Sequence, residues 1–231
     1  MDQSLKPLDV AYGSAVSAQR QRVLRNTYAL LALSMIPTVL GAWLGVQMGF
    51  SFFSGSPLIG ALLFMGIAFG FFFAIEKFKN SGVGVLLLLG FTFFMGLMLS
   101  RLIGAVLGLS NGGQLIATAF GGTALVFAAM ATLASTMKRD VASLGKWLMI
   151  GAVVLMVAAI ANIFLKMPAL MLTISALAVV IFSAFILYDL KRIIDGGETN
   201  YVTATLSIYL DVYNVFTSLL QILGVLGGND D

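Results

Sequence analysis

Long apolar runs, separated by short polar breaks, dominate the pattern along this chain. An apolar run of about 20 residues is long enough to cross a bilayer as a helix. The breaks are rich in Gly, Ser, Asn and Asp, which favour turns. Seven runs can be counted, and they are Tyr28–Gly49, Pro57–Ile75, Gly82–Leu107, Gln114–Met137, Leu144–Leu165, Pro168–Leu190 and Thr203–Leu226. The pattern therefore predicts an all-α integral membrane protein, with one seven-helix membrane domain over residues 27–227.

Polar segments flank this domain at both ends of the chain. The first 26 residues contain no short apolar core followed by a small-residue cleavage site, so we do not expect them to form a signal peptide. We expect residues 1–26 to form a polar cytosolic tail and residues 228–231 to form a short acidic C-terminal tail.

Basic residues are distributed unevenly between the two sides that this map defines. With the N-terminus inside, the outer segments hold only Lys166, while Arg101 lies at the outer end of the third span and is expected to snorkel. The cytosolic segments hold Lys6, Arg20, Arg22, Arg25, Lys77, Lys79, Lys138, Arg139, Lys146, Lys191 and Arg192. Because cytosolic loops carry the excess of Lys and Arg, the asymmetry predicts a cytosolic N-terminus. An odd number of spans then places the C-terminus outside.

The last apolar run differs from the others because polar residues recur along its whole length. Their spacings of four, four, three, four and three place them on one face of a helix. Such a face cannot lie against lipid, so it either packs at the centre of the bundle or lines a water-filled path. Tyr209 and Tyr213 lie beside it. We call this face the polar stripe, and its members are Thr203, Ser207, Asp211, Asn214, Ser218 and Gln221.

Two aspartates at the end of the chain are the main candidate site. Asp211 would lie about 16 Å along a helix that begins near Asn200, close to mid-membrane. Asp189 lies near the cytosolic end of the sixth run, whose amphipathic pattern continues towards Ile194. Spans joined by a short loop are normally neighbours, so we expect the two carboxyls to come within reach of each other.

Two carboxylates brought close in a low-dielectric environment cannot both ionise without a large cost. The pair would share a proton and titrate as a unit, or attract a hard cation such as Ca²⁺, which prefers oxygen ligands. In the alternative interpretation, Asp189 caps the cytosolic end of its helix and Asp211 bonds a neighbouring helix. Intramembrane ionisable residues are usually functional, which favours the first interpretation.

Small residues at four-residue spacing are expected to let helices pack closely. The pairs are Gly41 with Gly45, Gly66 with Gly70, and Gly104 with Gly108. Close contact through such pairs is the ordinary packing device of helices in lipid. We therefore interpret all three pairs as packing contacts.

Composition narrows the function further. The chain is 60% hydrophobic and only 10% charged, with mean hydropathy +1.02, whereas soluble domains carry about a quarter charged residues. It has no cysteine and no histidine, which excludes disulfides, thiolate metal sites and Ser–His hydrolases. A retinal protein needs a lysine in its last span for the Schiff base, and this span has none. A secondary transporter is expected to show an internal repeat, and the two halves of this sequence show no convincing repeat. The scattered basic residues do not indicate nucleic-acid binding. We therefore expect no enzymatic activity.

Several motifs resemble one known family. LYDLKRII at residues 187–194 and YLDVYNVFTSLLQILG at residues 209–224 resemble the paired aspartate motifs of the Bax inhibitor-1 family, also called the transmembrane BAX inhibitor motif family. The DGGETNY loop, AFGGTALVF at Ala119–Phe127 and RVLRNTYALLALSM are similar to its bacterial YccA-like branch. The resemblance covers about residues 22–224. It implies seven helices with the last one central, and a location in the bacterial inner membrane.

Two functions follow as expectations from this resemblance. The first is a pH-sensitive Ca²⁺ leak in which Asp189 and Asp211 are the sensor and gate, with transient Ca²⁺ at the pair and no resident cofactor. Ser207, Asn214, Ser218 and Gln221 would line its pathway. The alternative is a modulator of an FtsH-type membrane protease that is engaged through the N-terminal tail and conducts no ions. In either case the surrounding partner is the lipid bilayer.

Overall fold

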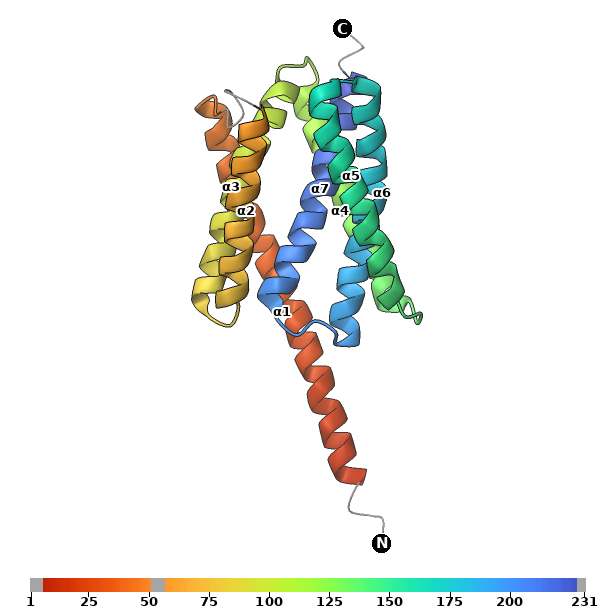
Figure 1. Cartoon of the computed structure of the whole chain (residues 1–231). Coiled ribbons are helices and arrows are strands. Elements are labelled where there is room, and N and C mark those ends of the chain that lie inside the picture. The colour runs from red at the N-terminus through yellow and green to blue at the C-terminus, as the bar shows by residue number, and fades with distance from the viewer. Residues whose placement is uncertain (1–5, 51–56, 228–231) are drawn as a thin grey trace.

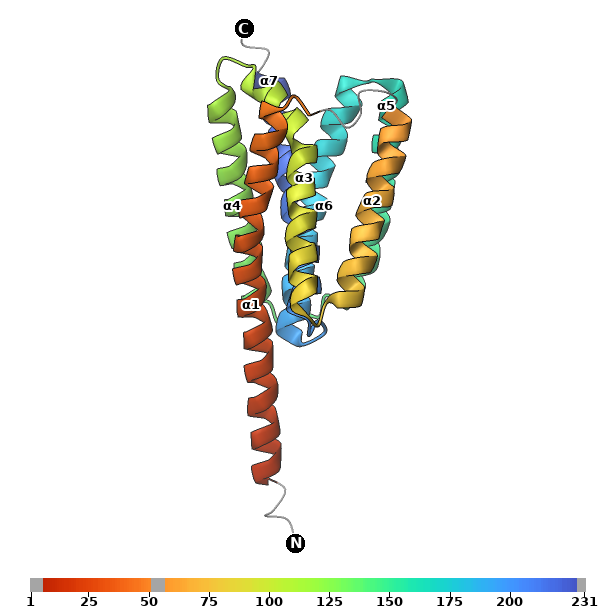
Figure 2. The same ribbon diagram turned by 90° about the vertical axis from the view of Figure 1, so that its left-hand side faces the viewer.

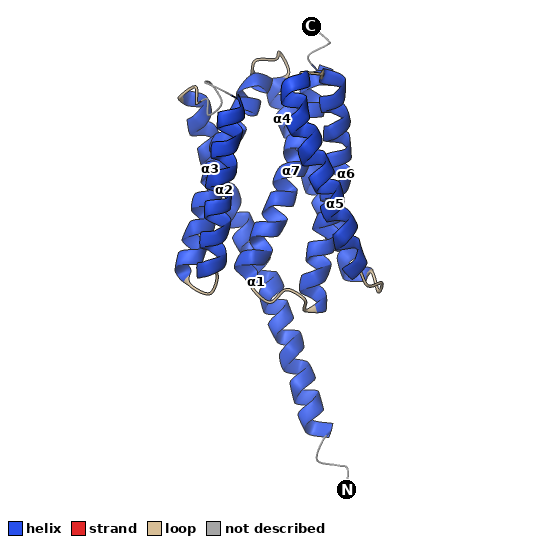
Figure 3. Ribbon diagram, in the orientation of Figure 1, coloured by secondary structure: helices blue, strands red, loops and turns tan. Residues whose placement is uncertain are grey.

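The computed structural model describes residues 6–50 and 57–227, with side chains from residue 16 to 50 and from 59 to 227. These residues form helices and connecting turns, with no strand among them (Figure 3). The helices are α1 (Lys6–Gln47), α2 (Pro57–Phe78), α3 (Gly82–Leu107), α4 (Gly112–Thr136), α5 (Ala142–Leu165), α6 (Pro168–Asp195) and α7 (Tyr201–Gly227). All seven are long and apolar enough to span a membrane, which confirms the predicted fold class. The chain reverses direction at each turn, so the described N- and C-terminal ends lie at opposite ends of the bundle (Figure 1). The expected tail at residues 228–231 lies outside the described residues.

The predicted spans agree closely with the helices except at α1. The third span matches α3 at both ends, and α6 continues past Leu190 to Asp195, as the amphipathic pattern indicated. Gly196 ends α6 in a left-handed conformation, with φ 85°, and its backbone N–H bonds to the Ile193 carbonyl at 3.1 Å. Glycine adopts this conformation without a steric penalty, which is why the helix can stop there and turn tightly into α7.

The first helix is much longer than the expected span at Tyr28–Gly49. It runs for 42 residues from Lys6, so most of the segment interpreted as a tail is helical. Pro7 lies in the first turn, where proline is tolerated, and no proline occurs again until Pro37. The N-terminal part of α1 projects well beyond the other helices in both views (Figures 1 and 2). Hydropathy alone missed this extension because it reports burial in lipid rather than helix propensity.

Glycines allow α1 and α3 to pack with their backbones in direct contact. A Cβ added at Gly41 would meet the backbone oxygen of Phe93, and one added at Gly96 would meet that of Thr38. At Gly45 it would come within 2.5 Å of the Ser100 side chain. The packing interpretation is therefore confirmed for Gly41 and Gly45.

The other predicted glycine pairs do not make such contacts. A Cβ at Gly66 or Gly70 of α2 would have nothing within 4 Å. At Gly104 it would only touch Val46 at 4.0 Å, and at Gly108 its neighbours belong to its own turn. The interpretation of these two pairs as close helix contacts was wrong. Four-residue spacing identifies a small-residue face but not the direction in which that face points.

The last helix lies in the middle of the bundle. α7 packs against α1, α2, α3, α4 and α6, whereas α5 packs mainly against α6. Among the described residues of α7, only Leu226 is exposed. Ile208, Val215 and Leu220 are fully buried, and they anchor α7 in the apolar core. No polar side chain on α7 is consequently exposed on the surface of the bundle.

Asn200 fixes the start of α7. Its Oδ1 accepts hydrogen bonds from the backbone N–H groups of Val202, at 2.9 Å, and Thr203, at 3.2 Å. Its Nδ2 donates to Lys79 O at 3.2 Å and to Asn80 Oδ1 at 2.8 Å. One side chain thus caps α7 and ties the α6–α7 turn to the α2–α3 turn.

Replacing Asn200 with alanine is expected to lower the free energy of unfolding by about 1–2 kcal/mol, because the helix cap is lost together with the bonds to the α2–α3 turn. Equilibrium unfolding in mixed micelles measures this change. Thr199→Ala in the same turn is the control, because Thr199 donates its hydrogen bond to Glu198 Oε1 through the backbone N–H, which alanine keeps. Equal effects of the two substitutions would contradict the capping role of Asn200.

Candidate functional site

The structure brings together the two aspartates that the sequence singled out. Asp189 lies one and a half turns before the end of α6 and Asp211 lies in the third turn of α7, and the two carboxyl groups lie close enough to interact electrostatically. Asp211 is 5% exposed. Its Oδ2 is buried without a hydrogen-bond partner among the residues that the structure describes. Buried polar atoms normally have a partner, so this oxygen can accept a proton or a cation.

Charged residues surround the Asp189 side of the pair. Arg192 and Glu198 both act electrostatically on Asp189, and they pair with each other, with Arg192 Nη2 3.4 Å from Glu198 Oε2. The Arg192 guanidinium also lies over the Tyr188 ring, 5.9 Å from its centroid. Ser207 joins Asp189, Arg192 and Glu198 in lining a small cavity. The candidate site is thus a carboxyl pair beside a cavity whose wall includes an ion pair.

The rest of the polar stripe serves other purposes. Gln221 Oε1 accepts a hydrogen bond from Ser175 Oγ of α6 at 2.8 Å, and Asn214 Nδ2 donates to the Leu210 carbonyl of its own helix at 2.7 Å. Thr203 Oγ1 bonds to Asn200 O, at 3.1 Å, and Ser218 is 7% exposed. No member of the stripe is exposed, which confirms that it does not face lipid. Its contacts resemble helix packing at most positions, and the Asp189–Asp211 pair is the exception.

A second polar face of α7 carries the tyrosines noted beside the stripe. Tyr209 Oη lies 2.9 Å from Thr38 Oγ1 of α1, and Tyr213 Oη donates to the Met95 carbonyl of α3 at 3.2 Å. Thr38 Oγ1 also donates to the Thr92 carbonyl at 3.2 Å. These bonds join α7 to the closely packed α1–α3 pair. α7 therefore presents carboxyl and amide groups to α6 and hydroxyl groups to α1 and α3.

The carboxyl pair offers too few oxygens for a resident Ca²⁺. The ion takes six to eight oxygen ligands. Within residues 6–50 and 57–227, no group of three or more His, Cys, Asp or Glu side chains could hold a metal.

Sequence reasoning did not identify three residues at or near the site. Arg192 was counted only as a cytosolic positive charge, although its three-residue spacing from Asp189 indicates neighbouring side chains on a helix. Glu198 was treated as part of a turn. Ser175, a lone serine within an apolar run, was not connected with Gln221, because the two are 46 residues apart.

Comparisons with known proteins agree with this architecture. The family described as "Inhibitor of apoptosis-promoting Bax1" matches residues 20–228. The "Modulator of FtsH protease YccA" of Escherichia coli K12 is 40% identical over 203 residues, covering 88% of this chain and 90% of that protein. The same identity and coverage are found for the "Inner membrane protein YccA" of a second E. coli strain, O6:H1. An uncharacterized protein of Pseudomonas aeruginosa is 41% identical over 219 residues, covering 94% of this chain and 96% of that protein.

The match extends over most of the chain, includes both aspartate motifs and agrees with the seven apolar helices. The relatives are bacterial, and one is named as an inner membrane protein. The chain therefore belongs to the Bax inhibitor-1 family and is a multi-pass protein of the bacterial inner membrane.

Proposed function

We propose that this protein modulates an FtsH-type membrane protease by binding to it, without catalysing a reaction itself. The observation that carries the proposal is its 40% identity, over nearly the full length of both chains, to a relative named as a modulator of that protease. The names of the family and of this relative describe an inhibitor and a modulator, which supports a regulatory role.

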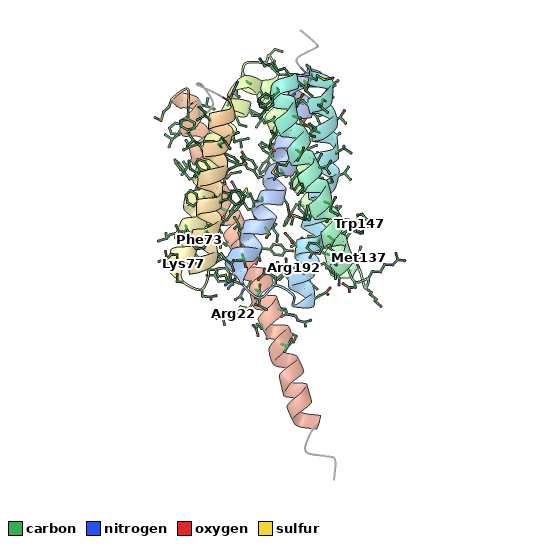
Figure 4. The ribbon with its side chains drawn as sticks, in the orientation of Figure 1. Arg22, Phe73, Lys77, Met137, Trp147 and Arg192 are labelled. Atoms are coloured by element: carbon green, nitrogen blue, oxygen red, sulfur yellow. The ribbon has the colours of Figure 1, made fainter. Side chains whose placement is uncertain are left out.

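The proposed orientation places the N-terminal end of α1 in the cytosol. Arg22, Lys77 and Arg192 come from three different helices and lie towards the same end of the bundle, the end from which α1 projects (Figure 4). The α5–α6 turn at the opposite end holds Lys166. An excess of Lys and Arg marks the cytosolic side of bacterial membrane proteins. The C-terminal end of α7 then faces the other side.

The projecting part of α1 is the segment that we expect the protease to engage. Its base contacts the α6–α7 turn, because a Cβ added at Gly196 would lie 2.6 Å from Arg20 Nε. Residues from Ala18 to Asn26 also line a cavity with Thr199 and Tyr201. A pull on the extension would therefore be transmitted to the turn that connects Asp189 with Asp211.

Deleting residues 2–15 is expected to abolish binding to the protease while leaving the bundle intact, because Ala18 to Asn26, which line the cavity beside the α6–α7 turn, are all retained. Co-purification from detergent with a proteolytically inactive FtsH-type protease measures the binding. A chain in which residues 2–15 keep their composition in a scrambled order is the control for length and charge. Undiminished binding of the deletion would contradict the role of the extension.

A second function is favoured by one specific feature, the unpartnered Oδ2 of buried Asp211 beside Asp189. We propose that the pair gates a proton-linked cation leak, with Ca²⁺ as the cargo. The cavity that holds Ser207 and Asp189 would provide its cytosolic entrance. Cation flux in liposomes, compared between the parent and variants of both aspartates, tests this function.

A further inference from the structure

A cavity of about 550 Å³ opens on the side of the bundle, away from the aspartate pair. α1 and α4 form its two sides, and α3 and α7 contribute to its inner wall. Val39 and Trp43 of α1 and Phe120 of α4 line it and are also 64%, 58% and 63% exposed. The cavity is therefore a cleft that opens onto the surface facing the hydrocarbon of the bilayer. We refer to it as the lateral cleft.

Apart from the exposed side chains of Trp43 and Gln47, the polar side chains that line the lateral cleft are hydroxyl groups. The four hydroxyl groups that line it are all bonded within the protein. Tyr209 pairs with Thr38 at 2.9 Å, Tyr213 donates to Met95 O at 3.2 Å, and Thr123 donates to Ala119 O at 2.8 Å. A polar ligand would lose its hydration without replacement, which is costly. The chemistry of the wall therefore selects an apolar occupant.

The dimensions of the cleft identify which apolar group fits. Its α1 side runs from Met35 to Gln47, which is about 18 Å of helix. One leaflet of a bilayer contributes about 15 Å of hydrocarbon. A helix is about 10 Å wide, so only part of its width could enter a cleft of about 550 Å³. An extended hydrocarbon chain matches the length and requires much less width.

We propose that the lateral cleft is a binding site for one acyl chain of a membrane lipid, entering from the leaflet at the C-terminal end of the bundle. The chain would run along α1 from Gln47 towards Met35 and end beside Tyr209 and Tyr213. Val212 lines the cleft, while the preceding residue, Asp211, meets α6. The acyl chain and the carboxyl pair thus lie against opposite sides of the same turn of α7. The proposal is independent of the protease and leak functions.

Tryptophan fluorescence can test this site, because the chain has two tryptophans and only Trp43 lines the cleft. Trp147 is 72% exposed on α5 and lies elsewhere on the molecule (Figure 4). Trp147→Phe leaves Trp43 as the sole reporter, and Trp43→Phe leaves Trp147. The quencher is a brominated fatty acid mixed into the detergent micelles. We expect the quenching of Trp43 fluorescence to saturate at a low mole fraction of this fatty acid. Quenching of Trp147 should rise only in proportion to that fraction.

Ala117→Phe, made in the Trp147→Phe chain, is expected to fill the cleft from α4. It should therefore abolish the saturable component of the Trp43 quenching. Ala117 is exposed, so the added ring does not have to enter the core. The matched control is Ala159→Phe, which places the same ring at an exposed alanine of α5 and should leave saturation unchanged. Proportional quenching of both tryptophans, unaffected by Ala117→Phe, would overturn the proposal.

Photocrosslinking distinguishes the acyl chain from other occupants. A photoreactive amino acid in place of Ala117, activated in native membranes, should give an adduct with the mass of a lipid. An adduct with the mass of a second copy of this chain, or of another protein, would show that a protein surface covers the cleft. Either of these protein adducts, or the absence of any adduct, would contradict the acyl-chain site.

Discussion

Gly96→Val is expected to lower the free energy of unfolding by roughly 3 kcal/mol, the upper end of the usual cost of overpacking. The first added carbon alone would meet the backbone oxygen of Thr38, and backbone cannot move aside as a flexible side chain can. α1 and α3 would have to separate. Thr38 also bonds to Thr92 and Tyr209, so the separation would disturb the hydroxyl contacts that hold α7.

Gly66→Val is the matched control for this prediction, because an added Cβ there has nothing within 4 Å. Its effect should stay within about 0.5 kcal/mol, as is usual for open surface positions. Unfolding in mixed micelles, followed by circular dichroism, measures both variants. A loss of stability for Gly66→Val as large as that for Gly96→Val would show that the two glycines do not differ in packing.

Asp211→Asn and Asp189→Asn are each expected to remove most of the pH dependence of Ca²⁺ flux through the protein in liposomes. Two unit charges about 4 Å apart repel by about 4 kcal/mol at an effective dielectric constant of about 20, which is roughly a thousandfold in an equilibrium. Asparagine keeps the shape of the side chain but cannot ionise, so a single replacement eliminates this repulsion. The parent should therefore change its flux with pH while both variants should not.

Because the chain has no histidine, a pH-dependent flux cannot come from the titration of a histidine in this protein. Histidine is the side chain that ordinarily titrates between pH ~5 and ~8, and this chain has none. Arg192 and Glu198 also lie near Asp189, and their ion pair belongs to its surroundings. Asp195→Asn is the control, because this half-exposed carboxyl on the same helix bonds Lys191 rather than Asp211. No flux above empty liposomes at any pH would contradict the leak function and leave protease modulation as the remaining proposal.

The membrane fold could be predicted from sequence because its main determinant is local. A run of apolar residues specifies a spanning helix whatever it packs against, and this is why Gly82–Leu107 was predicted at both ends. The N-terminal extension of α1 was not predicted, because a polar helix and a polar tail have similar hydropathy. The open surroundings of Gly66 could not be foreseen either, because spacing contains no information about which neighbour a helix face meets.

The candidate site was partly predictable because some of its signals are also local in the sequence. The polar stripe and the short turn after Gly196 indicated that Asp189 and Asp211 would be neighbours, and the structure places them together. The partners of Tyr209 are Thr38 and Thr92, which lie 171 and 117 residues away in the chain, and no local pattern connects them. The lateral cleft is likewise a product of how four helices meet, so sequence periodicity could not reveal it.

The most direct test of protease modulation is the rate at which an FtsH-type protease degrades a second membrane substrate in proteoliposomes. Three chains are compared with protein-free controls: the full chain, the chain without residues 2–15, and the chain carrying both Asp189→Asn and Asp211→Asn. We predict that the full chain and the double aspartate variant slow the degradation equally, and that the shortened chain has no effect. Unchanged degradation with the full chain would contradict the proposed function. An effect retained without residues 2–15 but lost with the carboxyls would assign it to the aspartate pair instead.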